Sequence, residues 1–162
     1  MQTRGVSHRQ AECPVARTVD VIGDRWSLLI VRDVFDGIGR FRELQRNLGL
    51  AKNILATRLR ELVAQGILET VPAGDGSAYQ AYSLTRKGRD LFSVIVALRQ
   101  WGETYLFDEG EPHSVLLDRE SRLPLKLRIT DASDRPISSD DAFVRKVSDI
   151  ESCGDDADAP VA

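Results

Sequence analysis

Polar and basic side chains recur at helical spacing between residues 40 and 60, and they are the side chains best suited to chemistry in this 162-residue chain. Arginine, lysine, asparagine and threonine donate hydrogen bonds to phosphate oxygens or to the edges of bases, and an alanine among them lets the backbone approach closely. The spacing therefore indicates a surface that binds double-stranded DNA. The residues are Arg40, Arg42, Arg46, Lys52, Asn53, Ala56, Thr57 and Arg60.

The elements that carry these side chains are predicted to be two helices joined by a tight turn. Residues 41–48 favour the first helix, Gly49 supplies the turn, and residues 51–65 favour the second helix. The buried face of the second helix should carry three leucines that recur at i, i+4 and i+7, namely Leu55, Leu59 and Leu62. A helix-turn-helix DNA reader needs such an apolar seam with a polar outer face, although an ordinary helical hairpin has the same pattern.

The residues after the second helix favour the DNA reader over the plain helical hairpin. Gly66 ends the helix, and residues 67–71 and 79–84 are predicted to form two short strands separated by a turn-rich segment. Helix, helix and hairpin follow each other in this order in a winged helix. The hairpin has no basic residue and has Asp75 near its tip, so it either contacts DNA little or does so through backbone N–H groups and Ser77.

The DNA-binding residues divide into two roles. Three of them should face the major groove from the second helix, namely Asn53, Thr57 and Arg60. Four others should mainly contact phosphates, namely Arg40, Arg42, Arg46 and Lys52. Arg58 lies closer to the buried face, where it would pair with Glu43 or Glu61 instead of DNA.

Two helices should precede this unit and one should follow it. Pro14 suits the first turn of a first helix, because its missing N–H has no partner there. Asp24 is a suitable N-cap for the next helix, which should pack Trp26 into the core. Thr85 should cap a long helix that runs from residue 86 to about residue 107.

The helix predicted at residues 86–107 is apolar on almost every side between positions 91 and 98. Such a helix must be covered on two sides, by its own domain and by either a second copy of the chain or the C-terminal segment. We favour a second copy, because a symmetric dimer places two reading helices about one turn of DNA (~34 Å) apart. The residues assigned to dimerisation are Leu91, Ile95, Leu98, Trp101 and Tyr105.

Five short islands between residues 13 and 88 resemble the HxlR family of bacterial winged-helix regulators in their order and spacing. They are CPV at 13–15, VIGDRWSLLI with its Gly-x-x-Trp at 21–30, FREL at 41–44, LATRLREL at 55–62 and LTRKG at 84–88. The resemblance implies a homodimeric DNA-binding transcriptional regulator of the MarR-like group. Some members of this family sense electrophiles or oxidants through a cysteine at this N-terminal position. The resemblance therefore makes Cys13 a candidate sensor.

Cys13 has two interpretations. It precedes a predicted helix and lies near Arg17, and both features favour the thiolate that a sensor needs. Alternatively, it is a small side chain that packs at the base of the dimer. We retain Cys13 as a candidate thiol switch, with an oxidant or an unidentified small molecule as the effector. Cys153 lies far from it in an acidic segment, so a reduced cytoplasm is the simpler context.

The charge of the chain is unevenly distributed. Residues 1–106 contain 15 Lys and Arg against 11 Asp and Glu, a net of +4, whereas residues 107–162 contain 7 against 14, a net of −7. The overall charge of −3 therefore belongs to the C-terminal part. The basic N-terminal part supports binding of nucleic acid, because phosphates respond to the local potential.

Three parts are expected along the chain. Residues 11–107 should form the winged-helix DNA-binding and dimerisation domain. Residues 108–147 should form a small β-rich appendage of unknown role, with strands at 114–118 and 123–129, and residues 148–162 should form an acidic, disordered tail. The fold class is therefore mainly α with a small β content, a winged helix-turn-helix followed by a long dimerisation helix.

Several other classes of protein are not supported. No run of about 18 apolar residues predicts a membrane span, and residues 1–10 do not resemble a secretory signal, which favours the cytoplasm. His8 and His113 lack metal-ligand spacing to the cysteines, so we expect no metal and no cofactor. No catalytic triad, paired-carboxylate motif or nucleotide loop indicates an enzyme.

Two functions remain. The first is a dimeric, sequence-specific DNA-binding transcriptional regulator that reads the major groove with the helix at residues 51–65. The alternative is a winged-helix module that binds a protein and has weak or no specific affinity for DNA. The hairpin without basic residues and the acidic tail motivate that alternative.

Overall fold

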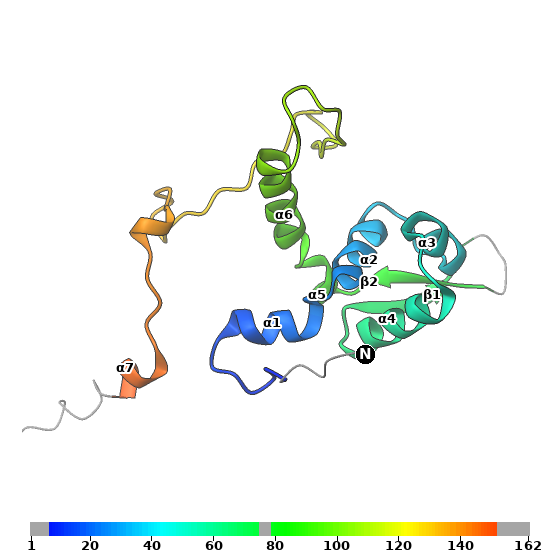
Figure 1. The fold of residues 1–162 in the computed structure, drawn as a ribbon, viewed down its shortest axis with the longest axis horizontal. Coiled ribbons are helices and arrows are strands. Elements are labelled where there is room, and N and C mark those ends of the chain that lie inside the picture. The colour runs from blue at the N-terminus through cyan, green and yellow to red at the C-terminus, as the bar shows by residue number, and fades with distance from the viewer. Residues whose placement is uncertain (1–6, 75–78, 152–162) are drawn as a thin grey trace, which may run out of the picture. The chain divides into compact units, whose positions relative to one another are not determined.

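The computed structural model describes residues 7–74 and 79–151, and it consists of two compact units that divide after Leu125 (Figure 1). The first unit contains six helices and a two-stranded antiparallel sheet among its described residues. They are α1 (Pro14–Ile22), α2 (Arg25–Phe35), α3 (Phe41–Leu48), α4 (Lys52–Ala64), β1 (Leu68–Pro72), β2 (Gln80–Leu84), α5 (Arg86–Arg89) and α6 (Phe92–Tyr105). This order confirms the expected winged helix-turn-helix in a mainly α fold.

One hydrophobic core holds the first four helices and the hairpin together. Its buried residues are Ile22, Ile30, Val31, Leu44, Leu50, Leu55, Leu59, Leu62, Ile67, Leu68 and Leu84. The three leucines of α4 expected in the core are at most 1% exposed, which confirms the amphipathic assignment of that helix. Trp26 packs half-buried against this core, and the Arg25 guanidinium lies 4.3 Å from the centre of its ring.

The ends of the helices follow from local sequence. The Asp24 carboxylate accepts hydrogen bonds of 3.0 and 3.1 Å from two backbone N–H groups in the first turn of α2, which confirms it as an N-cap. Gly49 ends α3 in the left-handed conformation with φ 63°, which opens the tight turn into α4. Gly66 adopts φ 67° between α4 and β1.

The prediction of a single helix from residue 86 to 107 is wrong, because the helical backbone is interrupted between α5 and α6. The Leu91 N–H donates to the Gly88 carbonyl at 3.1 Å, three residues back instead of four, so the backbone tightens at the break. The Thr85 hydroxyl accepts a hydrogen bond from the Gly88 N–H, as expected of an N-cap, and it donates to the Gly66 carbonyl at 2.6 Å. The start of α5 is therefore fixed to the residues that precede β1.

Gly88 lies where α5 touches the backbone at the start of β1. A Cβ atom added to Gly88 would lie 2.2 Å from the carbonyl oxygen of Ile67, closer than any side chain can approach backbone. The structure shows that the absence of a side chain is a steric requirement for packing α5 against the hairpin.

The chain after α6 forms little regular structure. The strands expected at residues 114–118 and 123–129 are wrong, because the described part of this segment contains only two isolated antiparallel bridges, Leu117–Pro124 in the first unit and Thr130–Pro136 in the second. The two expected strands meet at Leu117 and Pro124, but one bridge does not extend into a ladder because the proline has no N–H to donate. The first unit continues to Leu125, so the domain boundary predicted after residue 107 stays a prediction.

The second unit contains a short 3-10 helix, Ser139–Asp141, and α7 (Val147–Glu151). Most of the acidic tail predicted to be disordered lies outside the described residues. No helix in the described part of the chain is long and apolar enough to cross a membrane. Residues 7–74 and 79–151 also contain no group of three or more His, Cys, Asp or Glu side chains that could hold a metal ion.

Replacement of Gly88 by alanine should destabilise the fold by about 1–3 kcal/mol, because the added methyl group must displace the Ile67 carbonyl. The measurement is urea unfolding followed by circular dichroism. Gly102→Ala in α6 is the matched control, because its added Cβ would have no neighbour nearer than 4.0 Å and alanine favours a helix. Equal unfolding midpoints for the Gly88 variant and the unmodified protein would contradict the steric requirement.

Candidate nucleic-acid interface

The predicted DNA-binding residues belong to α3 and α4, with Arg40 at the N-cap of α3, and the turn at Gly49 joins the two helices (Figure 1). Two of them, Arg40 and Ala56, are half-buried. The other six are exposed, namely Arg42, Arg46, Lys52, Asn53, Thr57 and Arg60. The helix-turn-helix therefore brings all eight residues to one part of the molecule, and their contacts with DNA stay a prediction.

The outer face of α4 has the geometry of a reading helix. Asn53, Thr57 and Arg60 follow one another at i, i+4 and i+7, so they form one exposed stripe opposite the buried leucines. Ala51 occupies the N-cap position and provides no side-chain hydrogen bond to the first turn. The positive end of the helix dipole is therefore not compensated by a capping side chain, which suits a phosphate.

Arg58 does not belong to this stripe, as the sequence indicated. Its Nη1 lies 2.7 Å from a carboxylate oxygen of Glu61, which confirms one of the two partners expected for it. Its Nε lies 3.4 Å from Oδ1 of Asp24, a partner that the sequence did not reveal. Because Asp24 caps α2, this ion pair joins α4 to the start of α2.

A buried carboxylate fixes α3 against α2. Asp33 is 1% exposed, and its Oδ1 accepts hydrogen bonds of 3.0 and 2.6 Å from Nε and Nη2 of Arg32. Its Oδ2 accepts a hydrogen bond of 2.8 Å from Nδ2 of Asn47 on α3. A charge buried so deeply must be paired, so this contact sets where α3 lies. Sequence reasoning missed Asp33, because no local pattern marks one acidic residue as buried.

The hairpin is attached to the loop that precedes α3. β1 and β2 pair as antiparallel strands, and the Tyr82 N–H donates to the Gly39 carbonyl at 2.8 Å. The hairpin therefore lies beside the helix-turn-helix, as a wing does. The predictions made for Asp75 and Ser77 lie outside the described residues.

A cavity of about 410 Å³ opens between α3, the start of α4 and the start of β2. Its lining combines cations, amides and aromatic rings: Arg40, Phe41, Arg42, Gln45, Lys52, Tyr79 and Gln80. Tyr79 is 73% exposed. The helices therefore supply the cations that the hairpin lacks, and Tyr79 and Gln80 are candidate contacts that sequence reasoning missed. Only the folding of the hairpin onto α3 reveals them.

The cations of α5 have a structural role. The Lys87 ammonium donates to the Gln65 carbonyl at the end of α4 at 2.7 Å, and Arg89 Nη1 donates to the Leu84 carbonyl at 2.6 Å. Both satisfy backbone carbonyls that the ends of α4 and β2 leave free. These cations are therefore engaged with the protein, unlike the exposed cations of α3 and α4.

The residues assigned to dimerisation fall on two sides of α6. Leu91 and Ile95 pack half-buried against the core, and Leu98 lies with Ile95 beside a cavity that faces α2. Trp101 and Tyr105 are 58% and 69% exposed, and the centres of their rings are 5.4 Å apart. Trp101 and Tyr105 therefore form an apolar surface that is not covered by the described chain.

A second exposed apolar pair lies on α1. Val15 and Val19 are 68% and 56% exposed, although they precede the buried Ile22 at i, i+4 and i+7 spacing. Hydrophobic side chains at helical spacing are usually covered in a stable protein. The first and last helices of the winged-helix unit thus both present apolar side chains to solvent.

Cys13 occupies the N-cap position of α1, and it is exposed. The Arg17 guanidinium donates to the Ala11 carbonyl, so the cation expected to support a thiolate is engaged with backbone. The preceding segment is held by Asp20, whose pKa lies below its ordinary value chiefly because the His8 backbone N–H donates to that carboxylate. The Cys13 thiol is thus accessible to an oxidant. Cys153 lies outside the described residues.

Comparison with known proteins identifies relatives of this architecture. The family model of the HxlR-like helix-turn-helix matches residues 21–109. The uncharacterised HTH-type transcriptional regulator Rv3095 of Mycobacterium tuberculosis is 44% identical over 113 residues, which cover 69% of this chain and 72% of that protein.

Two solved structures are also similar. PA1607, described as a candidate transcription factor, is 53% identical with a TM-score of 0.81, and the match covers 87% of this chain and 99% of that chain. The redox regulator HypR in its oxidised form is 35% identical with a TM-score of 0.52, and the match covers 57% of this chain and 96% of that chain.

Proposed function

Because this chain belongs to the HxlR-like helix-turn-helix family, we propose that it is a dimeric transcriptional regulator whose α4 reads a specific DNA sequence. The observation that carries the proposal is the exposed stripe of Asn53, Thr57 and Arg60 opposite the buried leucines of α4. A helix-turn-helix inserts its second helix into the major groove with such a stripe facing the bases. In this role Arg60 and Asn53 contact base edges, and Thr57 contacts bases or thymine methyl groups.

Phosphate contacts come from the surface around the reading helix. Arg42 and Lys52 line the cavity beside the hairpin together with Tyr79 and Gln80, and this cavity suits one DNA strand at the edge of the major groove. Charged side chains in such positions attract phosphates whatever the sequence, so they set affinity and orientation. Arg40 and Arg46 act in the same way at the two ends of α3.

The exposed apolar residues support a homodimer. Trp101 and Tyr105 on α6, with Val15 and Val19 on α1, provide the surface that a second copy would cover. A two-fold axis through such a contact presents the same surface on both subunits and turns both reading helices toward one face of the duplex. Leu98, which is 49% exposed, extends that surface along α6, and the half-buried Leu91 and Ile95 would support it from behind.

A thiol switch at Cys13 is a second element of the proposal. Its support is the exposed position of Cys13 at the start of α1 and the similarity to HypR, which is described as a redox regulator. A peroxide oxygen would transfer to the thiol, which gives a sulfenic acid and water. The added oxygen beside α1 would then disturb the apolar surface proposed for dimerisation.

The two classes of DNA contact predict different mutant behaviour. Arg60→Ala should weaken binding to the preferred sequence by about 1–3 kcal/mol and relax the sequence preference. Arg42→Ala should weaken binding to all sequences alike and reduce the slope of affinity against salt by about 1. The measurement is fluorescence anisotropy over a salt series, with the upstream DNA of the gene and a scrambled duplex. If the upstream DNA does not bind, a sequence selected from random DNA replaces it.

Arg119→Ala is the matched control, because it removes the same charge from an exposed residue outside α3 and α4. Equal weakening by the Arg60 and Arg42 variants would contradict the division of roles. If the protein binds no selected duplex with a salt-dependent affinity, the proposal of DNA reading is contradicted. That result would favour the alternative function, a winged-helix module that binds a protein.

Trp101→Glu should convert the dimer into a monomer, because the charge would be buried at the apolar contact without a partner. Trp101→Phe keeps an aromatic side chain and should remain dimeric. Analytical ultracentrifugation distinguishes the two, and circular dichroism should show the same helix content in both variants because Trp101 is largely exposed. A dimeric Trp101→Glu protein would contradict the proposed surface.

Cys13→Ser should make DNA binding insensitive to hydrogen peroxide, because serine keeps the size of the side chain but cannot form a sulfenic acid. The expected result for the unmodified protein is release of DNA on oxidation, measured by anisotropy. Cys153→Ser is the control and should keep the response. If Cys153→Ser loses the response and Cys13→Ser keeps it, the switch is Cys153 and not Cys13.

A further inference from the structure

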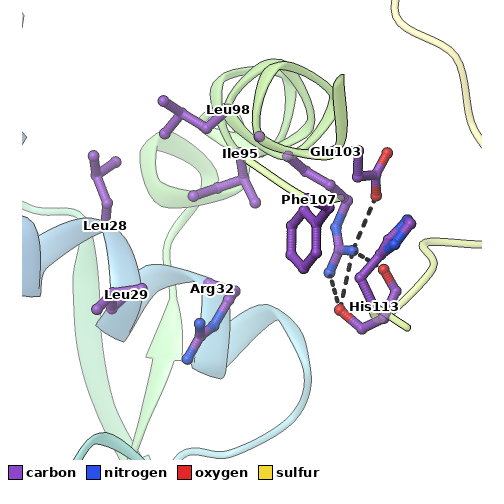
Figure 2. Close-up of a pocket in the computed structure, with 11 residues that line it drawn as sticks. Leu28, Leu29, Arg32, Ile95, Leu98, Glu103, Phe107 and His113 are labelled. Carbon is purple, nitrogen blue, oxygen red and sulfur yellow. Dashed lines mark hydrogen bonds and ion pairs between the residues drawn. The ribbon is translucent and has the colours of Figure 1, made fainter. Parts of the chain in front are cut away.

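The first part of the chain after α6 is anchored to that helix. Arg99 Nη1 donates to the Ser114 carbonyl at 2.6 Å and lies 3.3 Å from Oε1 of Glu103 (Figure 2). Gln100 Nε2 donates to the Leu125 carbonyl at 2.9 Å. These contacts lie within the first unit, which ends at Leu125. The second unit therefore begins where these anchors end.

The second unit leaves its apolar side chains uncovered. None of its residues from 126 to 149 is buried. Five large apolar side chains among them are at least 40% exposed, namely Leu127, Ile129, Phe143, Val144 and Val147. The adjacent Phe143 and Val144 are the most exposed of the five, at 90% and 87%. Neighbouring apolar side chains left in solvent commonly mark an interaction site.

The backbone around Phe143 resembles a strand that has no neighbour. Ala142 is extended, with φ −124° and ψ 146°, and the trace stays extended between the 3-10 helix and α7 (Figure 1). No N–H or carbonyl group of residues 142–145 forms a backbone hydrogen bond with another described residue. An unpaired extended segment is a template on which a second strand can pair.

The charges on either side of Phe143 make this segment complementary to itself. Residues 140–146, which we call the arm, read Asp-Asp-Ala-Phe-Val-Arg-Lys. If two arms run antiparallel with Phe143 opposite Phe143, then Asp141 lies opposite Arg145 and Asp140 lies opposite Lys146. Opposite charges and aromatic rings across a strand pair stabilise it, whereas like charges destabilise it. A parallel pair would place like charges side by side, so the arm favours an antiparallel copy of itself.

We propose that the arm pairs as an antiparallel strand with the arm of a second copy of this chain, with the two Phe143 side chains at the two-fold axis. This contact is separate from the surface proposed on α1 and α6. Two short strands alone are only marginally stable in water. The arms therefore pair where the α6 contact holds two copies together at an effective concentration of about 1 mM. This step rests on the proposed dimer, which the arm contact then strengthens.

Disulfide trapping tests the register in the full-length protein, with Cys13→Ser and Cys153→Ser to remove the native thiols. In the proposed register residue 142 lies opposite residue 144 of the second copy. Ala142→Cys/Val144→Cys therefore places thiols face to face. Either substitution alone leaves the two thiols on a diagonal, about 7–8 Å apart, which is too far for a disulfide.

We expect at least about ten-fold more covalent dimer from the double-cysteine protein than from either single variant, on non-reducing gels after equilibration with reduced and oxidised glutathione. Equal crosslinking by all three would overturn self-pairing. It would leave Phe143 and Val144 to a different protein as their partner.

Charge inversion tests the ends of the arm, by the dimer dissociation constant from analytical ultracentrifugation. Asp140→Lys and Lys146→Asp should each weaken the dimer at least about five-fold, because each places like charges opposite one another twice. The double variant restores both pairs and should dimerise within about two-fold of the unmodified protein. Lys126→Asp is the control, an exposed charge of the same unit outside the arm. A double variant as weak as the single ones would overturn the pairing.

Phe143→Ala should weaken the dimer about ten-fold, because it removes the aromatic pair at the axis. Its circular dichroism should match that of the unmodified protein, since Phe143 is 90% exposed. Ile129→Ala is the control, because Ile129 is 69% exposed in the same unit but lies outside the arm. An unchanged dissociation constant for Phe143→Ala would overturn the proposal.

Trp101→Glu separates the arm from the α6 contact. Added to the double-cysteine protein, it should lower the yield of covalent dimer at least about ten-fold at micromolar concentration, because the arms lose their high effective concentration. An unchanged yield would overturn the dependence on α6. If the unmodified protein is monomeric at every concentration, the proposed dimer fails. The excess of covalent dimer in the double-cysteine protein over the single variants then still decides the arm.

Discussion

A carboxylate buried in the centre of a small domain constrains the helices around it. Asp33 is 1% exposed, and its hydrogen-bond partners come from Arg32 on its own helix and from Asn47 on α3. Loss of a partner leaves a buried charge uncompensated at a cost of about 3–5 kcal/mol, so α3 cannot turn freely about its axis. Because α4 follows α3 through the tight turn at Gly49, the same carboxylate also constrains the orientation of α4.

The basic residues of the winged-helix unit are divided by what they contact. Arg58 and Lys87 lie against acceptors of the protein, which are carboxylates for the first and a helix-terminal carbonyl for the second. The cations on the outer surface of α3 and α4 point to solvent. The overall charge of −3 is therefore a poor guide to the partner, whereas the location of the exposed cations is a good one.

Features that depend on neighbours in sequence were predictable. The buried leucines of α4, the turn at Gly49 and the cap at Asp24 follow from spacing and residue type alone. The break between α5 and α6 was not predictable, because neither Asp90 nor Leu91, where the helix is interrupted, is a glycine or a proline. The strands expected after α6 had the right alternation, but the two segments pair only at the isolated bridge Leu117–Pro124, where the proline has no N–H to extend the ladder. Tyr79 and Gln80 at the cavity between α3, α4 and β2 were also not predictable, because only the folded hairpin brings them to α3.

The exposed stripe of α4 has an evolutionary consequence. Asn53, Thr57 and Arg60 lie at the surface, whereas the neighbouring Arg58 joins α4 to α2. Substitutions at exposed positions without such contacts usually change the free energy of unfolding by less than about 0.5 kcal/mol. Under the proposed function, a duplicated gene can therefore acquire a new target sequence through these three positions while the scaffold keeps its stability. The face proposed for recognition and the face that packs the core lie on opposite sides of α4, so selection can act on them independently.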